Sequence, residues 1–294
     1  MHDSSSIKVG IAWRNFLKEM SGHIPENELI AIANMIFEHF FHLNPAQRIL
    51  QRQNELPHGA DSLLQKIIQD LKDHVPVQHI TGIANFCDLE FRVDNRVLIP
   101  RPETEELVEW VLARIADDKL QASPLRILDV CTGSGCIAIS LGHRLKGKHQ
   151  VAGCDISVEA LTLAGDNAQR NNVTVQFFWC DALSENIPMH QVDIIVCNPP
   201  YVTPAEKLLM CPNVINHEPH LALFVPAHDP LIFYKAVATQ ATRILKPKGM
   251  IFFEINENFP YQTIEILQSC GFENCIAKED FHGKPRFVHA QMPA

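Results

Sequence analysis

Short apolar runs alternate with amphipathic stretches through the second half of the chain, and this alternation limits the fold more than any other feature. Strands are predicted at 125–130, 150–155, 174–179, 192–197 and 249–255, and helices at 136–146, 157–171, 230–245 and 259–269. Such spacing is typical of a mostly parallel sheet with helices on both faces. Two further runs, 272–278 and 286–291, predict an antiparallel hairpin at one edge. The pattern therefore favours an α/β domain of seven strands with one antiparallel edge strand.

The first part of the chain has a helical pattern instead. Apolar residues recur at helical spacing through 7–74, and Asn44-Pro45 supplies an N-cap and a proline at the first helical position. A chain of 294 residues also exceeds the usual size of one domain. We therefore predict a small α-helical bundle over residues 1–78.

A β-hairpin linker over 79–103 is predicted to join this bundle to the α/β domain at 104–294. One strand is expected over 86–93, a turn at Asp94-Asn95, and a returning strand over 97–99. Pro100-Arg101-Pro102 ends the hairpin, and a helix begins near Glu103. Thr104 is expected to cap that helix.

Composition argues against several classes of protein. The net charge is −9, and residues 1–78 carry seven Lys and Arg against nine Asp and Glu, whereas a duplex-DNA binder normally has a basic surface. No apolar stretch approaches the ~20 residues of a membrane helix, and the N-terminus lacks the features of a signal peptide. We therefore expect neither direct nucleic-acid binding nor membrane association.

The cysteines indicate the compartment. Nine cysteines, an odd number without a C-x-x-C pair, are typical of a reducing compartment, so we expect a cytoplasmic protein. Pro219 separates His217 from His220 and no third ligand lies near them in the sequence, so no metal site is predicted.

A glycine-rich loop follows the first strand of the predicted sheet. Gly133 and Gly135 allow the backbone to approach a ligand closely, and the helix that follows offers free N–H groups to an anion. Asp155 ends the second strand twenty residues after Gly135, where a carboxylate usually binds ribose hydroxyls. A ribose-bearing cofactor is therefore expected.

Two cofactors fit this loop. Gly133-x-Gly135-x-x-Ala138 also matches the dinucleotide fingerprint, so NAD competes with S-adenosyl-L-methionine. Asp129 precedes the loop, where a carboxylate suits an amino-acid ammonium better than a pyrophosphate. Asp181 follows the third strand, where its carboxylate can accept from the adenine amino group. We favour S-adenosyl-L-methionine, because hydride transfer does not require the motif that ends the fourth strand.

That motif is Asn198-Pro199-Pro200-Tyr201, after the buried run 192–197. The prolines lack an N–H and fix φ, so the backbone carbonyls are held rigidly. The Asn198 side-chain oxygen and the Pro199 carbonyl can accept both hydrogens of a planar –NH2 group, with Tyr201 flat against it. Accepting both hydrogens raises the electron density on nitrogen and stabilises the charge it acquires. The motif predicts in-line attack of an amide or aromatic amine on a methyl carbon.

Together these motifs resemble those of the release-factor glutamine methyltransferases, over nearly the whole chain. The resemblance rests on residues 99–108, the 129–135 loop, the 198–201 motif and residues 218–223. It implies a Rossmann-like S-adenosylmethionine-dependent methyltransferase domain and a helical domain that recognises the substrate protein. The implied reaction is direct SN2 methylation of the side-chain amide nitrogen (N5) of glutamine in the Gly-Gly-Gln motif of class I peptide chain release factors. The implied product of the cofactor is S-adenosyl-L-homocysteine.

The residues and the resemblance together give a set of candidate site residues. Those expected at the cofactor are Asp129, Cys131, Thr132, Gly133, Ser134, Gly135, Asp155, Asp181, Ala182 and Asn198. Those expected at the substrate are Asn198, Pro199, Pro200, Tyr201 and Glu103, with Asn198, Pro199 and Tyr201 as catalytic residues. Cys131 stands where the family usually has glycine, and Ala182 where a bulkier residue often packs on adenine.

Alternative functions remain open at this stage. The Asn-Pro-Pro-Tyr motif alone is shared with DNA adenine and some ribosomal RNA methyltransferases. A glutamine methyltransferase that acts on a ribosomal protein has the same site chemistry, whereas a nucleic-acid amino-methyltransferase needs a basic cleft. A partner-binding protein that keeps the cofactor for stability transfers no methyl group. We expect a monomer.

Overall fold

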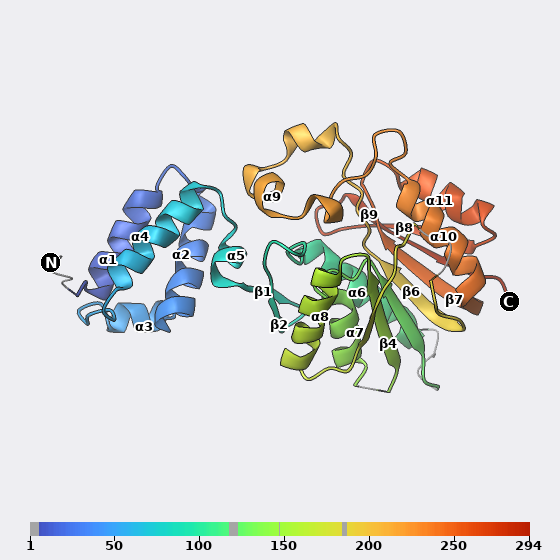
Figure 1. Ribbon diagram of the computed structural model, residues 1–294, viewed down its shortest axis with the longest axis horizontal. Coiled ribbons are helices and arrows are strands. Elements are labelled where there is room, and N and C mark those ends of the chain that lie inside the picture. The colour runs from blue at the N-terminus through green and yellow to red at the C-terminus, as the bar shows by residue number, and fades with distance from the viewer. Residues whose placement is uncertain (1–5, 118–122, 147, 184–186) are drawn as a thin grey trace. The chain divides into compact units, whose positions relative to one another are not determined.

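The computed structural model describes residues 6–117, 123–146, 148–183 and 187–294 (Figure 1). The chain divides into two compact units. The first contains the N-terminal residues up to Gly82 together with 212–217, and the second contains 83–211 and 218–294.

The first unit is helical, as the periodicity predicts. Its helices are α1 (Val9–Met20), α2 (Glu26–Phe41), α3 (Pro45–Leu50), α4 (Ala60–Lys72), α5 (Val77–Thr81) and α9 (Pro212–His217). Phe16, Ile36 and Phe37 are fully buried in its core. The predicted N-cap of α3 is confirmed, because the Asn44 side chain accepts from Gln47 N at 2.9 Å and the Gln47 side chain accepts from Asn44 N at 3.0 Å.

The hairpin lies earlier in the chain than the sequence indicated. β1 (Ile83–Phe86) pairs antiparallel with β2 (Leu89–Arg92). The returning strand predicted over 97–99 was wrong, because residues 97–99 pair with no strand. A turn does form at Asp94-Asn95, where Val97 N donates to Asp94 O at 3.2 Å, but it joins no hairpin. The hairpin turn falls at Cys87 and Asp88, whose φ angles of 49° and 62° give the left-handed pair that a two-residue hairpin requires.

The second unit contains a seven-stranded sheet with the order β5-β4-β3-β6-β7-β9-β8. Its strands are β3 (Arg126–Val130), β4 (Gln150–Asp155), β5 (Gln176–Trp179), β6 (Val192–Cys197), β7 (Leu245–Glu254), β8 (Glu273–Glu279) and β9 (Pro285–Gln291). The first five are parallel, and β9 is antiparallel to both β7 and β8. The antiparallel strand therefore lies second from the edge, not at the edge as predicted, because the second strand of the hairpin is the one that joins β7.

Helices cover both faces of this sheet (Figure 1). They are α6 (Pro102–Asp117), α7 (Cys136–Arg144), α8 (Val158–Arg170), α10 (Ile232–Ile244) and α11 (Pro260–Ser269). Successive strand residues alternate between the two faces: Leu128 and Val130 pack in the core with α10 and α11, and Ile127 packs in the core with α6 and α7. Two 3₁₀ turns, η2 (Glu206–Leu209) and η3 (His220–Ala222), follow β6. None of the helices described is long and apolar enough to span a bilayer.

The strand order determines where a ligand can bind. From β3 the chain moves outward to β4 and β5, and then returns to place β6 on the other side of β3. Ligands of open α/β sheets bind at such a reversal, beyond the carboxyl ends of the strands. The segments that leave β3, β4, β5 and β6 therefore meet at one edge of the sheet.

Asn167 of α8 ties the hairpin to the glycine loop. Its side chain is fully buried; Oδ1 accepts from Arg92 N at 2.7 Å, and Nδ2 donates to Arg92 O at 3.1 Å and Ser134 O at 3.0 Å. We predict that Asn167→Ala lowers the free energy of unfolding by about 2–4 kcal/mol, measured by urea denaturation, because three buried groups lose their partner. Asn171→Ala, which removes bonds to Glu90 O and to the backbone carbonyl of Asn167 at a less buried position, serves as the control and should cost less than half as much. Equal losses would contradict this role of Asn167.

Candidate active site

A cavity of about 250 Å³ opens at the carboxyl ends of the parallel strands. It brings together nine of the predicted residues: Cys131, Thr132, Gly133, Ser134, Asp155, Asp181, Ala182, Asn198 and Pro200. Residues 96–98, Pro100, Arg101 and Thr104 also line it. The other predicted residues that the structure describes, namely Asp129, Gly135, Pro199, Tyr201 and Glu103, do not line this cavity.

The glycine loop takes a left-handed backbone at three positions. Cys131, Gly133 and Gly135 have φ angles of 62°, 53° and 80°. Gly135 is needed for packing as well, because a Cβ there would lie 2.9 Å from Ile139 Cδ1. Cys131 adopts a left-handed conformation that favours glycine, and glycine is the residue expected at this position from the resemblance.

Asp129 lies beneath the loop. Its Oδ2 accepts from Thr132 Oγ1 at 2.6 Å and from Ala138 N at 3.2 Å, and within the described part of the chain its buried Oδ1 has no hydrogen-bond partner. Burial raises the pKa of Asp129 to about 7. One oxygen of Asp129 therefore stabilises the loop through two hydrogen bonds, and its other oxygen makes none within the described residues.

The other two predicted acids lie at the cavity wall and are held by backbone N–H groups. Asp155 accepts from Gly133 N at 2.9 Å and from Ser157 N at 2.9 Å. Burial raises the pKa of Asp155, and these hydrogen bonds oppose that shift. Asp181 accepts from Leu183 N at 2.9 Å. Both side chains are thereby oriented before any ligand is bound.

Gln240 of α10 supports the Asp181 loop, and the sequence did not reveal this. Its side chain is buried, donates to Ala182 O at 2.8 Å and accepts from Ile187 N at 2.8 Å. A polar residue on the apolar face of a predicted helix was the available signal.

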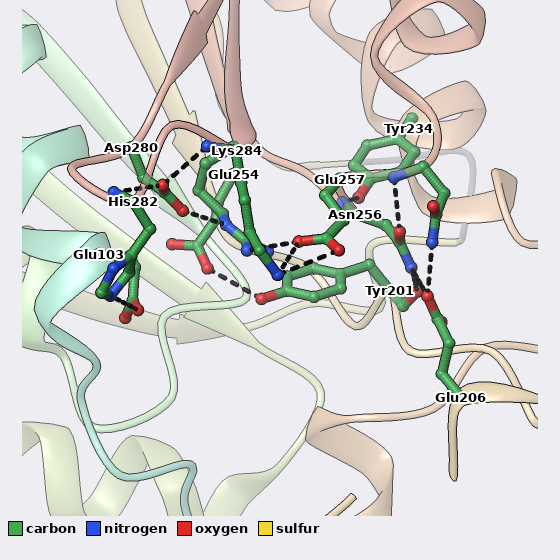
Figure 2. A network of polar contacts seen from close by, with 12 residues as sticks. Glu103, Tyr201, Glu206, Tyr234, Glu254, Asn256, Glu257, Asp280, His282 and Lys284 are labelled. Atoms are coloured by element: carbon green, nitrogen blue, oxygen red, sulfur yellow. Dashed lines mark hydrogen bonds and ion pairs between the residues drawn. The ribbon is translucent and has the colours of Figure 1, made fainter. Parts of the chain in front are cut away.

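The 198–201 motif is joined to β7 by a buried polar network. Asn198 Nδ2 donates to Thr104 Oγ1 at 3.2 Å, and Thr104 Oγ1 donates to Glu254 Oε2 at 2.7 Å. The Tyr201 hydroxyl donates to the other oxygen of Glu254 at 3.0 Å, as Figure 2 shows. The Thr104 side chain therefore links the motif to Glu254, so the expectation that it caps the helix was wrong.

Further contacts hold Tyr201 in place. Asn256 Nδ2 donates to Tyr201 O at 3.1 Å and to Glu206 Oε1 at 2.9 Å (Figure 2). Burial raises the pKa of Tyr201, and Glu254 adds to that shift. Glu254 and Asn256 were missed by sequence reasoning, although an acid that ends a buried strand, as Asp155 does, was a usable signal.

Glu218 supports the part of the cavity wall that residues 97–101 form. This buried carboxylate accepts from Ile99 N at 3.1 Å and from Arg101 Nη2 at 2.5 Å. Arg96 pairs with Asp94 at 2.7 Å. Glu103 lies near the exposed His282, with 4.0 Å between Oε1 and Nε2 (Figure 2).

A sheet of this order, with a glycine loop after β3 and Asn-Pro-Pro-Tyr after the neighbouring strand β6, defines an S-adenosylmethionine-dependent methyltransferase. The Methyltransferase small domain family matches residues 112–220, and the PrmC N-terminal domain family matches residues 12–82. The preference for S-adenosyl-L-methionine over NAD is thereby confirmed.

Curated relatives identify the particular family. The chain is 38% identical to a release factor glutamine methyltransferase of Flavobacterium psychrophilum, over 93% of this chain and 95% of the relative. It is 42% identical to one of Bacteroides thetaiotaomicron, over 77% and 80% of the two chains. The chain belongs to the release factor glutamine methyltransferase family.

The residues present fit the cofactor. Asp155 and Asp181 line the cavity at the ends of neighbouring strands, where hydroxyl and amino groups of a nucleoside need acceptors. The uncommitted oxygen of Asp129 offers a further acceptor beneath the loop, suited to an ammonium.

Removing the Glu218 carboxylate should weaken cofactor binding. Glu218→Ala leaves Arg101 and Ile99 N without their partner, and the 97–101 wall loses its support. We predict that the Kd for S-adenosylhomocysteine, measured by calorimetry, rises about tenfold. Glu257→Ala is the matched control, because Glu257 pairs with Lys284 and Arg286 away from the cavity, and its Kd should not change. An unchanged Kd in the Glu218 variant would show that the wall does not depend on this carboxylate.

Asp129 should make the free protein less stable as pH rises. Its folded pKa of about 7 lies above the ordinary value, so the folded state holds an extra proton between about pH 4 and pH 7. The stability that this proton provides is fully present below about pH 4 and is lost as pH rises through 7. Relative to the natural protein, Asp129→Asn should therefore gain about 2–3 kcal/mol in free energy of unfolding between pH 5 and pH 8. A difference that is constant across this range in denaturation experiments would be the contrary result.

Proposed function

We propose that this protein methylates the side-chain amide nitrogen (N5) of the glutamine in the Gly-Gly-Gln motif of class I peptide chain release factors. The observation that best supports the proposal is the hydrogen bonding of the Asn198 side chain, which lines the cavity. Its –NH2 group is engaged by Thr104, which leaves its amide oxygen for an incoming –NH2 group. The two relatives described above are named release factor glutamine methyltransferases, which supports a release factor as the substrate.

The residues of the motif act on the substrate amide. S-adenosyl-L-methionine supplies a methyl carbon made electrophilic by the sulfonium. Asn198 Oδ1 and Pro199 O accept the two hydrogens of the glutamine –NH2 group, which orients its nitrogen and stabilises the positive charge that the nitrogen gains. No base is needed for attack, because an N-alkylated amide cation loses its proton readily. Tyr201, fixed by Glu254 and Asn256, does not line the cavity of the free protein and is proposed to pack beside the amide once the substrate is bound.

The helical unit is proposed to recognise the substrate protein. Ile49 and Leu50 of α3 are 65% and 84% exposed, so this unit presents large apolar side chains at its surface. We further propose a monomer that works in the cytoplasm, since its nine free cysteines fit a reducing compartment.

The experiment offers methyl-labelled cofactor to three substrates: a purified release factor, a ribosomal protein and duplex DNA. A release factor with alanine in place of the Gly-Gly-Gln glutamine is the matched control. We predict label on the glutamine of the unaltered release factor alone, located by mass spectrometry. Label on the ribosomal protein or on DNA, with none on the release factor, would refute the proposal.

Asn198→Ala tests the role of the motif in the same assay. We expect kcat to fall about a hundredfold or more, because the transition state loses one of its two acceptors. The Kd for S-adenosylhomocysteine should stay within about tenfold of that of the natural protein. Full activity would remove Asn198 from the mechanism, and methyl transfer absent from both proteins would favour a non-enzymatic role.

A further inference from the structure

We propose that Glu254 and Thr104 are positioning residues that determine which end of the Asn198 amide faces the substrate. The inference rests on the proposed function, because it assigns further residues to the same site. Three hydrogen bonds set this orientation: those from Thr104 and Tyr201 to Glu254, and the one from Asn198 to Thr104.

Glu254 accepts at both oxygens. It is 2% exposed at the end of β7, where Thr104 Oγ1 lies 2.7 Å from one oxygen and the Tyr201 hydroxyl lies 3.0 Å from the other. Burial raises the pKa of Glu254 above its ordinary value, and the hydroxyl groups of Thr104 and Tyr201 and the charge of Arg286 oppose that shift. Both hydroxyls donate their hydrogen to Glu254, and in its ionised form the carboxylate has none to donate in return.

The hydrogen bond from Thr104 to Glu254 also determines how Thr104 can interact with Asn198. A threonine hydroxyl has one hydrogen, and Glu254 takes it, so Thr104 Oγ1 can only accept from its other neighbour. Asn198 must therefore present its –NH2 group to Thr104, at 3.2 Å, and its oxygen faces away from Thr104. Within the described residues, Asn198 Oδ1 has no hydrogen-bond partner in the protein.

The opposite orientation of the amide is unfavourable for two reasons. It sets Asn198 Oδ1 against the lone pairs of Thr104. It also turns two amide hydrogens toward the hydrogens of the substrate –NH2 group, which needs acceptors. The two ends of a carboxamide are nearly equal in size, so packing alone does not select between them. The selection comes from Glu254, which accepts the hydrogen of the Thr104 hydroxyl.

The sheet register explains why Glu254 is in reach. Cys197, the last residue of β6, lies opposite Phe253 of β7. The residues that follow these two, Asn198 and Glu254, therefore lie close to each other. The same carboxylate binds Tyr201, and thus contacts both ends of the motif, directly at one end and through Thr104 at the other.

Thr104→Val tests the chain of hydrogen bonds from Glu254 through Thr104 to Asn198, because it removes the hydroxyl and keeps the shape of the side chain. We predict that kcat for release-factor methylation falls about ten- to a hundredfold, while the Kd for S-adenosylhomocysteine stays within about threefold. Thr104→Ser, which keeps the hydroxyl, should recover most of the lost activity. Thr263→Val is the matched control: Thr263 is equally buried and donates to Phe259 O at 2.9 Å in α11, and its loss should leave kcat unchanged.

A double variant separates positioning from general destabilisation. If Thr104 acts through Asn198, then Thr104→Val added to Asn198→Ala lowers kcat by no more than about twofold further. A full further loss, or a Thr104→Val kcat equal to that of the natural protein, overturns the inference. Glu254→Gln, whose amide can donate to Thr104 and so release the orientation of Asn198, gives the same test if Thr104→Val does not fold. An unaltered protein that fails to methylate the glutamine refutes the proposed function instead.

Discussion

The parallel pairing of β3 with β6 is the contact on which the site depends. Because Val130 lies opposite Cys197, the glycine loop and the Asn-Pro-Pro-Tyr motif leave the sheet side by side. In the proposed reaction one loop binds the electrophile and the other binds the nucleophile, and in-line transfer requires both to be close together and fixed in place. The strands on either side, β4 and β7, extend the same edge and contribute Asp155 and Glu254.

Buried acids at this edge organise polar groups before any ligand arrives. Asp129 and Glu254 are almost inaccessible to solvent, and burial raises the pKa of both. Asp129 is stabilised by donors close to it in sequence, a threonine hydroxyl and a backbone N–H of the glycine loop and the helix that follows. Glu254 is stabilised by two hydroxyls from segments distant in sequence. A group fixed in this way needs little reorganisation during methyl transfer, which is the main source of electrostatic stabilisation in enzymes.

The sequence predicted the parts of this arrangement that are encoded locally. Apolar periodicity located the strands, and the loop after β3 and the motif after β6 carry their chemistry in adjacent residues. The hairpin was misplaced because Cys87 and Asp88 take positive φ angles without a glycine or asparagine to indicate it. Thr104 and Glu254 were not connected because they are 150 positions apart, and only the tertiary structure joins them. Gln240 supports a loop 58 positions away for the same reason.

The orientation of the Asn198 amide decides whether the motif can accept from the substrate, and neutron diffraction measures this orientation directly. The crystal would contain the protein with S-adenosylhomocysteine and a Gly-Gly-Gln peptide, exchanged into heavy water. The account predicts both side-chain deuterons of Asn198 on the atom nearest Thr104, with the bare oxygen about 3 Å from the glutamine nitrogen. Deuterons on the Asn198 atom that faces the glutamine would contradict it.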